Sequence, residues 1–240
     1  DSGIRDDHPD IRNRIWVNEK EIPNNGYDDD GNGYIDDYKG WDFAYDDNRP
    51  TDGFGHGTNI ATVIGATTNN RIGFAGIDHA CRLMNLKNLR DDNYGEYSWW
   101  SESIKYAADN GADVINMSEG GDDYSETLET AIKYALKRGK FIVAAMMNKG
   151  DQRDYYPASF KGVFAVGATD TDDNRCTRFS WGGGSCYGRH IAVVAPGNKI
   201  YGLDYEDLND YTMYWSGTSQ STAIVSALAS LLLSQNSSRT

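Results

Sequence analysis

The sequence predicts an α/β fold, a three-layer αβα sandwich with a mostly parallel central sheet. From about residue 57 onward, short apolar runs alternate with amphipathic runs of about 10–15 residues, which is typical of β-α-β units. The apolar runs are rich in Val, Ile and Ala, as expected for strands that are buried on both faces. No internal repeat and no Pro/Ser-rich linker divides the chain, so we expect a single domain over residues 1–240.

Each element has its own signal in the sequence. The run HGTNIATVIGA predicts a helix, because Ile60, Val63 and Ile64 fall on one face of it. Gly111 and Gly139 mark the ends of the next two helices, because a glycine in the left-handed conformation commonly ends a helix. The predicted helices cover residues 56–66, 99–111, 124–139 and 219–233, and the predicted strands cover residues 81–89, 113–118, 140–147, 163–169 and 190–197.

Charge and hydropathy argue against two kinds of partner. The formal net charge is −13, whereas nucleic-acid binding requires clustered Lys and Arg. No run of about 18 apolar residues is present, so we expect no membrane-spanning segment. Many acidic residues lie in short Asp-rich loops, which favours cation binding, with a solvated acidic surface as the alternative.

The three cysteines have different surroundings in the sequence. Cys176 and Cys186 flank the short polar segment TRFSWGGGS, which a disulfide bond would close into a loop. We expect this disulfide, and the alternative is two unpaired thiols. Cys81 lies in the apolar run CRLMNL and is expected to be a buried free thiol.

The run DDDGNGYIDD, from Asp28 to Asp37, matches the front half of a calcium-binding loop. Oxygen-bearing side chains alternate along it, and glycines allow the sharp bend that wraps a hard cation. Lys39 stands where an EF-hand has its closing glutamate, so we expect a calcium loop outside an EF-hand; the alternative is a solvated acidic turn. The expected Ca²⁺ ligands are Asp28, Asp30, Asn32 and Tyr34, with Asp36 or Asp37 closing the site.

Reactive side chains stand at three places in the chain. Asp1 lies in DSG, His56 in GHGT at the start of a predicted helix, and Ser219 in GTS at the start of another. Each motif alone is weak, because a serine in the first turn of a helix is usually only a cap. If the three side chains converge, the imidazole can remove the serine proton while the carboxylate orients the imidazole.

Together the motifs resemble a known family. In order, DSGIRDDHPD, GHGTNIATVIGA, VINMSEGG, YPASFKGVFAVGATD, VVAPG and SGTSQSTAIVSALAS resemble the marker segments of the subtilisin-like serine proteases, from Asp1 to about Ser234. The resemblance implies a subtilisin-like fold and an endopeptidase that acts through an acyl-enzyme. Asp1 would orient His56, His56 would be the general base and acid, and Ser219 the nucleophile. Asn148, in AAMMN, would donate to the oxyanion together with the backbone N–H of Ser219.

The same resemblance implies how substrate is bound. An extended peptide or protein segment would pair with two stretches of main chain. Two departures from the family, Met147 and Tyr155, are expected to narrow the pocket for the side chain before the scissile bond, so that small residues are preferred. The acidic Glu119 is expected to favour basic side chains at an outer subsite. The two pairing stretches are Asn93-Tyr94-Gly95 and Ser118-Glu119-Gly120.

Further expectations follow from the resemblance. A second Ca²⁺ site would use Asp10 and Asn70, with the carbonyls of Thr68, Ile72 and Phe74. Because the family has a strand before the triad aspartate and further helices after the nucleophile helix, we expect a domain truncated at both ends. We also expect a secreted or extracytoplasmic monomer with an inhibitory propeptide. The alternatives are an inactive peptide-binding homologue, a transpeptidase and a calcium-binding module without catalysis.

Overall fold

Four parallel strands form the central sheet of the computed structural model, which describes residues 1–236. The strands are β3 (Val114–Met117), β4 (Phe141–Ala145), β5 (Phe164–Thr169) and β6 (Ile191–Pro196), adjacent in that order. Their register pairs Ile115 with Ile142 and Ala144 with Ala165. The four strands predicted within residues 113–197 are therefore confirmed, and their carboxyl ends meet at one edge.

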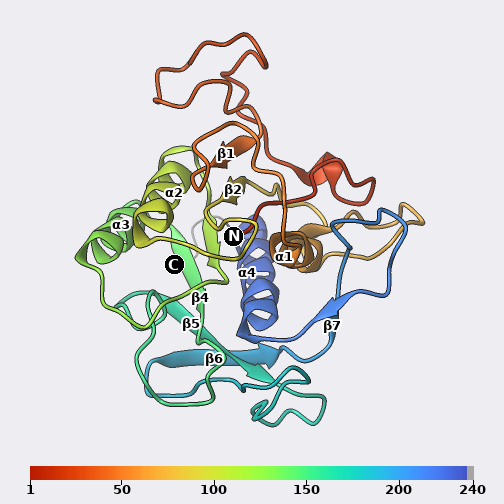
Figure 1. Ribbon diagram of the computed structural model, residues 1–240, viewed down its shortest axis with the longest axis vertical. Coiled ribbons are helices and arrows are strands. Elements are labelled where there is room, and N and C mark those ends of the chain that lie inside the picture. Colours follow the sequence, from red (N-terminus) through yellow and green to blue (C-terminus); the bar gives the residue numbers. More distant parts are fainter. Residues whose placement is uncertain (237–240) are drawn as a thin grey trace.

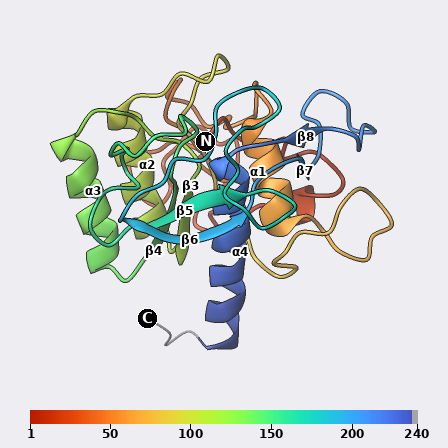
Figure 2. The same cartoon turned by 90° about the horizontal axis from the view of Figure 1, so that it is seen from below.

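Helices cover both faces of this sheet (Figures 1 and 2). On one face of the sheet, Ile142 and Ala144 of β4 pack with Ile104 and with other residues of the two helices that cover residues 97–109 and 126–137. Val143 points to the opposite face and packs with Ile224. This alternation places one core on each side of the sheet, as the αβα prediction requires. The helices are α2 (Tyr97–Asp109) and α3 (Glu126–Lys137) on one face, and α1 (His56–Gly65) and α4 (Thr218–Gln235) on the other.

Helix α3 shows why these segments are helical. The Ser125 side chain caps it by accepting a hydrogen bond from Leu128 N at 3.2 Å. Glu126 in the first turn and Lys137 in the last turn both match the helix dipole. The chain leaves the helix through Gly139, whose φ of 75° is the left-handed conformation expected from the sequence.

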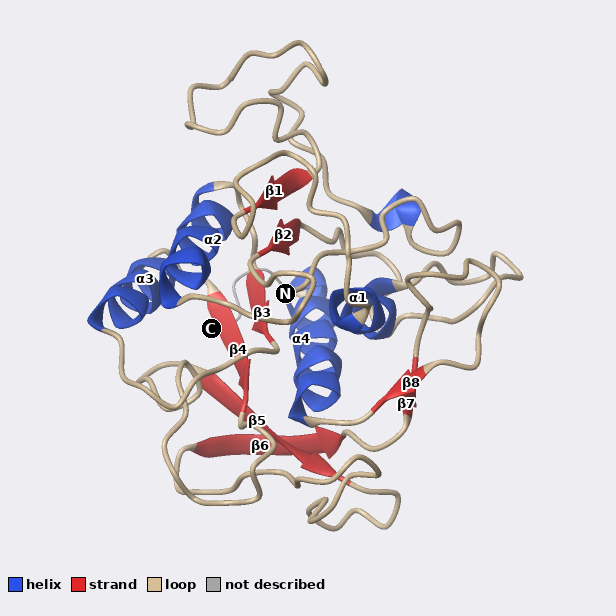
Figure 3. Ribbon diagram, viewed as in Figure 1, coloured by secondary structure: helices blue, strands red, loops and turns tan. Residues whose placement is uncertain are grey.

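Two small sheets lie apart from the central sheet, and only one of their strands falls within a predicted strand. Strand β1 (Gly40–Asp42) pairs in parallel with β2 (Asn85–Lys87), and β7 (Ile200–Tyr201) pairs antiparallel with β8 (Tyr214–Trp215). Only β2 forms within the strand predicted over residues 81–89. A Cβ atom on Gly40 would lie 1.9 Å from the Asn85 carbonyl oxygen, so this close pairing requires glycine. These strands are too short to show a period in the sequence, and much of the first 55 residues is loop (Figure 3).

A gap separates β2 from β3, which are not paired with each other. A cavity of about 390 Å³ lies between the two strands, and Asp1 is at one end of it. The Asp1 carbonyl accepts hydrogen bonds from Asn88 N at 2.9 Å and from Leu89 N at 3.2 Å. The carboxyl end of β2 therefore holds Asp1 beside the edge of the sheet at which the carboxyl ends of the central strands meet.

The expected disulfide is absent, because all three cysteines are free. Ser185 N donates a hydrogen bond to the Cys176 carbonyl, which places the two cysteine segments side by side. Their side chains diverge: Cys176 packs with Phe179, whereas the Cys186 sulfur belongs to the core beside α2 and α3 and accepts a hydrogen bond from Lys149 N. Cys81 is free as predicted, although only partly buried; burial raises its pKa to about 12.

Helix α4 buries small polar residues in its first half, whereas Leu228 and Leu232 near its end are exposed. Figure 2 shows the end of this helix extending beyond the sheet. Within residues 1–236, no helix is both long enough and apolar enough to cross a membrane.

Candidate active site

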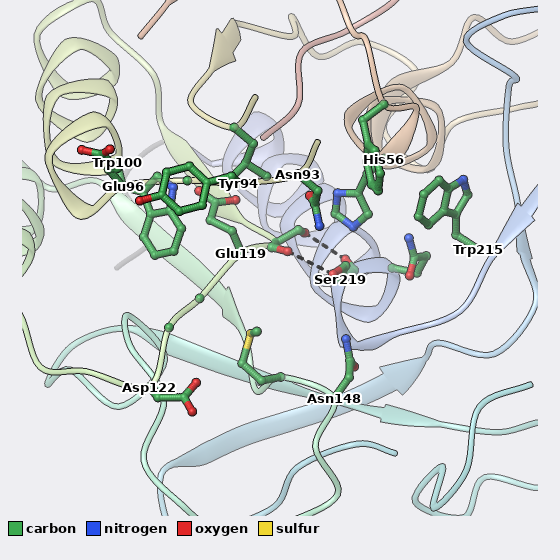
Figure 4. A pocket seen from close by; sticks show the side chains of 18 of the residues that line it. His56, Asn93, Tyr94, Glu96, Trp100, Glu119, Asp122, Asn148, Trp215 and Ser219 are labelled. Carbon is green, nitrogen blue, oxygen red and sulfur yellow. Dashed lines mark hydrogen bonds between the residues drawn. The ribbon is translucent and has the colours of Figure 1, made fainter. Parts of the chain in front are cut away.

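An open cleft of about 1,410 Å³ runs across the carboxyl ends of the central strands (Figure 4). The loops after β2, β3 and β4 form one part of its lining, and the first turns of α1 and α4 form another. His56, Asn148 and Ser219 all line this cleft, so the fold gathers three of the four predicted catalytic residues around one space.

Asp1 and His56 form the hydrogen bond that the sequence predicts. His56 Nδ1 lies 2.8 Å from Asp1 Oδ1. Because a carboxylate oxygen can only accept, the imidazole proton is on Nδ1, and the lone pair of Nε2 is free. Burial lowers the pKa of His56 to about 4, so the imidazole is neutral near pH 7, as a general base must be.

Asp52 fixes the relative position of these two residues. This buried carboxylate accepts hydrogen bonds from Ser2 Oγ, Gly55 N and Thr58 N, each at 2.8 Å. It therefore ties the residue after Asp1 to the first turn of α1, which begins at His56. Asp52 was not among the residues predicted from the sequence, although its position shortly before GHGT was an available signal.

Trp215 is a second residue that the sequence analysis missed. Its ring lies 5.4 Å from that of His56 in an edge-on arrangement, and it lines the cleft (Figure 4). Phe54 packs against the same indole at 5.7 Å. The two aromatic rings shield the imidazole from water, which is consistent with the lowered pKa of His56.

Ser219 is the second residue of α4. Its hydroxyl donates to the Ser118 carbonyl at 3.0 Å, and the Ser118 hydroxyl donates to the Ser219 carbonyl at the same distance (dashed lines in Figure 4). The strand-end loop after β3 therefore holds the start of the helix. The hydroxyl would have to leave this carbonyl to give its proton to His56, because no hydrogen bond joins Ser219 Oγ to His56 within the described residues.

Asn148 presents an amide donor to the cleft. Its Oδ1 accepts hydrogen bonds from Thr218 N at 2.9 Å and Thr218 Oγ1 at 3.0 Å. Because the Thr218 amide can only donate, the oxygen of Asn148 must face α4, and Nδ2 is left for another partner. The backbone N–H of Ser219 is in the first turn of α4, where N–H groups have no partner within the helix. These two donors suit a developing negative oxygen.

The predicted substrate-binding stretches line the cleft, whereas one predicted pocket residue does not. The lining includes Met147, whose φ of 71° is left-handed. Tyr155 is 1% exposed, its ring lies in the core beside α2 and α3, and its hydroxyl donates to Asp151. Tyr155 therefore does not narrow the cleft. The stretches that do line it are Asn93-Tyr94-Gly95 and Ser118-Glu119-Gly120.

Glu119 lines the cleft but turns its carboxylate toward the protein. Oε1 accepts a hydrogen bond from Asn88 Nδ2 at 3.3 Å, and Oε2 lies 3.9 Å from the backbone nitrogen of Asp1. The side chain is 5% exposed. Its carboxylate thus lies beside Asp1 and away from the open part of the cleft.

The predicted metal ligands are only partly brought together. Asp28 and Asp30 each offer an oxygen close to one of Glu21, a residue that the sequence did not indicate. Asp36 and Asp37 are not in this group. All four aspartates accept hydrogen bonds within the loop region. Asp10 and Asn70 are adjacent as expected. However, the oxygens of Asp10 accept hydrogen bonds from Asn70 Nδ2 and Phe74 N, at 2.6 and 2.8 Å. In the loop, Asn32 Oδ1 accepts from Tyr34 N.

Comparison with known proteins agrees with this geometry. The profile described as "Subtilase family" matches residues 1–240. A thermophilic serine proteinase of Bacillus sp. (strain AK1) is 42% identical over 197 residues, covering 82% of this chain and 47% of the relative. Thermitase of Thermoactinomyces vulgaris is 33% identical over 238 residues, covering 99% of this chain and 74% of the relative.

A solved structure agrees as well. The crystal structure of a cold adapted subtilisin-like serine proteinase superposes with a TM-score of 0.78 at 25% identity, covering 98% of this chain and 74% of that chain. This match confirms the predicted αβα fold. The chain thus spans less than half of the first relative and about three quarters of the other two proteins.

Proposed function

The chain belongs to the subtilase family, and from that premise we propose that it is a serine endopeptidase with Asp1, His56 and Ser219 as its catalytic triad. The observation that carries the proposal is the 2.8 Å hydrogen bond between Asp1 and His56 beside a cleft that also contains Ser219. This bond fixes the tautomer of the neutral imidazole. The imidazole lines the same cleft as the hydroxyl of Ser219, which stands at the start of a helix.

The proposed reaction follows from these positions. His56 Nε2 accepts the proton of Ser219 Oγ as that oxygen attacks the peptide carbonyl carbon. The carbonyl oxygen becomes negative and accepts hydrogen bonds from Asn148 Nδ2 and Ser219 N. The imidazolium then protonates the leaving amine, and water enters and hydrolyses the acyl-enzyme by the reverse proton path. Asp1 stabilises the imidazolium throughout.

The substrate of this reaction would be an extended peptide or an unfolded protein segment. The two stretches named above lie along the cleft, and pairing with main chain tolerates many side chains. The carboxylate of Glu119 lies beside Asp1, so it does not support the expected preference for basic residues. We also propose that the enzyme acts outside the cytoplasm and that calcium stabilises its fold.

Calcium fits the acidic loop better than the second expected site. In the loop, a buried carboxylate oxygen of Glu21 lacks a hydrogen-bond partner among the described residues. At the second site, neither Asp10 nor Asn70 has such an unpartnered buried oxygen among the described residues. We therefore propose the loop as the principal calcium site, with Ca²⁺ contributing stability and taking no part in the chemistry.

A fluorophosphonate probe is expected to label the protein on Ser219, because the probe reacts only with a serine that a neighbouring base activates. Tryptic mass mapping identifies the labelled residue, and heat-denatured protein serves as the control. Cleavage of an unfolded protein in the presence of a competing amine then separates hydrolysis from transpeptidation. No label on Ser219 would indicate the inactive homologue.

Met147→Gly is expected to widen the specificity pocket. A Cβ atom on Gly120 would lie 2.9 Å from Met147 Sδ, so the Met147 side chain lies against Gly120 where both residues line the cleft. Glycine also adopts the left-handed backbone conformation of this position without strain, so the free energy of unfolding should rise by about 1 kcal/mol. We expect kcat/KM for large aromatic residues before the scissile bond to rise about tenfold relative to alanine, measured with matched peptide pairs. An unchanged ratio would contradict the narrowed pocket.

A further inference from the structure

One end of the proposed substrate cleft is acidic. Glu96 follows the first pairing stretch, Asp122 and Asp123 come shortly after the second, and all three side chains are exposed and line the cleft. Figure 4 shows Glu96 and Asp122 at the end of the cleft that lies away from Trp215. Within residues 1–236, no lysine or arginine lines the cleft, so its lining carries an excess of negative charge.

Few groups of the protein neutralise these carboxylates. Within residues 1–236, neither Glu96 nor Asp123 forms an ion pair. Arg153 lies 3.6 Å from Asp122, but both side chains are more than half exposed, and such a pair is largely screened by water. The same guanidinium lies closer to Asp151, at 2.7 Å. The three carboxylates are therefore available to a positively charged group of a ligand.

Two aromatic side chains at the start of α2 line the cleft beside these acids. The rings of Tyr97 and Trp100 pack edge to face, with their centroids 5.1 Å apart. A Cβ atom on Gly121 would lie 2.1 Å from the Tyr97 hydroxyl oxygen, so this ring reaches from α2 to the residue after the second pairing stretch. The apolar stem of a lysine or arginine packs on aromatic rings, and the ring faces attract its cationic head. Rings flanked by carboxylates therefore suit a basic side chain.

The indole N–H of Trp100 is an independent sign that a ligand binds at this end of the cleft. Trp100 is 5% exposed and lines the cleft, and its Nε1 is buried without a hydrogen-bond partner within residues 1–236. A buried donor without an acceptor is unfavourable. A Cβ atom on Gly95 would lie 2.6 Å from this nitrogen, so the N–H lies beside the main chain of the first pairing stretch. A peptide that pairs with Gly95 would bring its carbonyl oxygens next to this donor.

We propose that the acidic end of the cleft binds a lysine or arginine side chain of the substrate, at a position several residues before the scissile bond. Its carboxylates are those of Glu96, Asp122 and Asp123, and its aromatic rings are those of Tyr97 and Trp100. The sequence predicts such a preference at Glu119, whose carboxylate instead lies beside Asp1. This inference rests on the proposed function and narrows its substrates to segments that carry a basic residue at that position.

The order of residues along the cleft gives this position. Ser118 is hydrogen-bonded to the proposed nucleophile, Ser219, at 3.0 Å. Met147, which borders the expected pocket for the residue before the scissile bond, lies against Gly120. Asp122 lies further along the same segment of chain, and an extended peptide advances about 3.3 Å per residue. A peptide paired with this segment therefore reaches the acidic end about three to five residues before the scissile bond.

The test uses peptide p-nitroanilides, in which the leaving group fixes the scissile bond. An alanine-rich series carries one lysine, norleucine or glutamate at each position from the second to the sixth before that bond. Binding is measured by calorimetry on the Ser219→Ala protein, which lacks the proposed nucleophile, and cleavage is measured on the parent. At one position we expect lysine to bind about tenfold more tightly than norleucine, and glutamate more weakly than both. The lysine preference should fall to about twofold in about 1 M NaCl, because exposed charges are screened.

Variants that remove charge identify the acids responsible. Glu96→Gln combined with Asp123→Asn keeps the shape of both side chains and should lower the lysine preference to about threefold or less. Glu102→Gln removes the same charge from an exposed residue of α2 that does not line the cleft, and should leave the preference unchanged. All lysine peptides have the same net charge, so attraction to the net charge of −13 on the protein cannot create a preference for one position.

The proposal is overturned if lysine and norleucine bind equally at every position, if lysine is preferred equally at every position, or if no peptide of the series binds. It is also overturned if Glu102→Gln lowers the preference as much as the double variant does. Failure of the proposed function has a different result: the Ser219→Ala protein shows the lysine preference at one position, whereas the parent cleaves none of the peptides.

Discussion

Replacing Ser219 by alanine is expected to lower kcat for peptide hydrolysis by about a millionfold, the size of effect known for the nucleophile of subtilisin. In the proposed reaction this hydroxyl is the group that forms the acyl-enzyme. Alanine removes only the hydrogen bond to the Ser118 carbonyl, worth about 1 kcal/mol, so the fold should persist. Burst-phase kinetics with an activated ester measure the loss of acylation directly.

Ser221→Ala is the matched control for this variant. Ser221 lies in the same helix and is also buried, but its hydroxyl donates to the Ala195 carbonyl at 2.9 Å, away from the cleft. It should lose a similar amount of stability while keeping fluorophosphonate labelling and kcat. If Ser219→Ala retains more than about a hundredth of the parent activity, Ser219 is not the nucleophile, since removing a triad member is far more costly.

The elements that could be predicted are those long enough to show a period. Helix α3 combines a serine cap, matched end charges and a terminal glycine, so its local sequence and its packing agree. Strands β1 and β8 have three and two residues, too few for alternation to show. Gly40 and Trp215 take their roles from partners far along the chain, which local patterns do not reveal.

The residues of the candidate site also fall into those that a local motif identifies and those that only tertiary contacts reveal. The motifs identified His56 and Ser219, because each reactive side chain stands in a run with its own glycines. Asp52 and Glu21 act through buried hydrogen bonds to other parts of the chain, so tertiary contacts decide their roles, and the place of Asp52 shortly before GHGT was the one available signal. The expected disulfide was wrong for a related reason: loop length shows that Cys176 and Cys186 lie near each other, but not that their side chains enter different cores.

Asn148→Asp is expected to lower kcat by about 10²–10³-fold with little change in KM, the magnitude known for the equivalent oxyanion donor in subtilisin. The structure makes this variant informative because Asn148 has two separable roles. Its Oδ1 accepts from Thr218 and secures the start of α4, whereas Nδ2 faces the cleft. Aspartate keeps the acceptor and removes the donor, so Tm should change by only a few degrees while the transition state loses a hydrogen bond.

Two comparisons separate the lost donor from the added charge. Ser180→Asp places the same charge in the same cleft at a residue with no role in the proposed reaction, and should leave kcat within a few fold. Asn148→Leu removes donor and acceptor together, so it should match the aspartate variant in kcat but fall below it in Tm. Each kcat is taken on the pH plateau of its variant, because a new carboxylate near His56 would raise the pKa of the imidazole. If Asn148→Asp keeps kcat within tenfold while Asn148→Leu does not, Asn148 acts by positioning α4, and Ser219 N is the principal oxyanion donor.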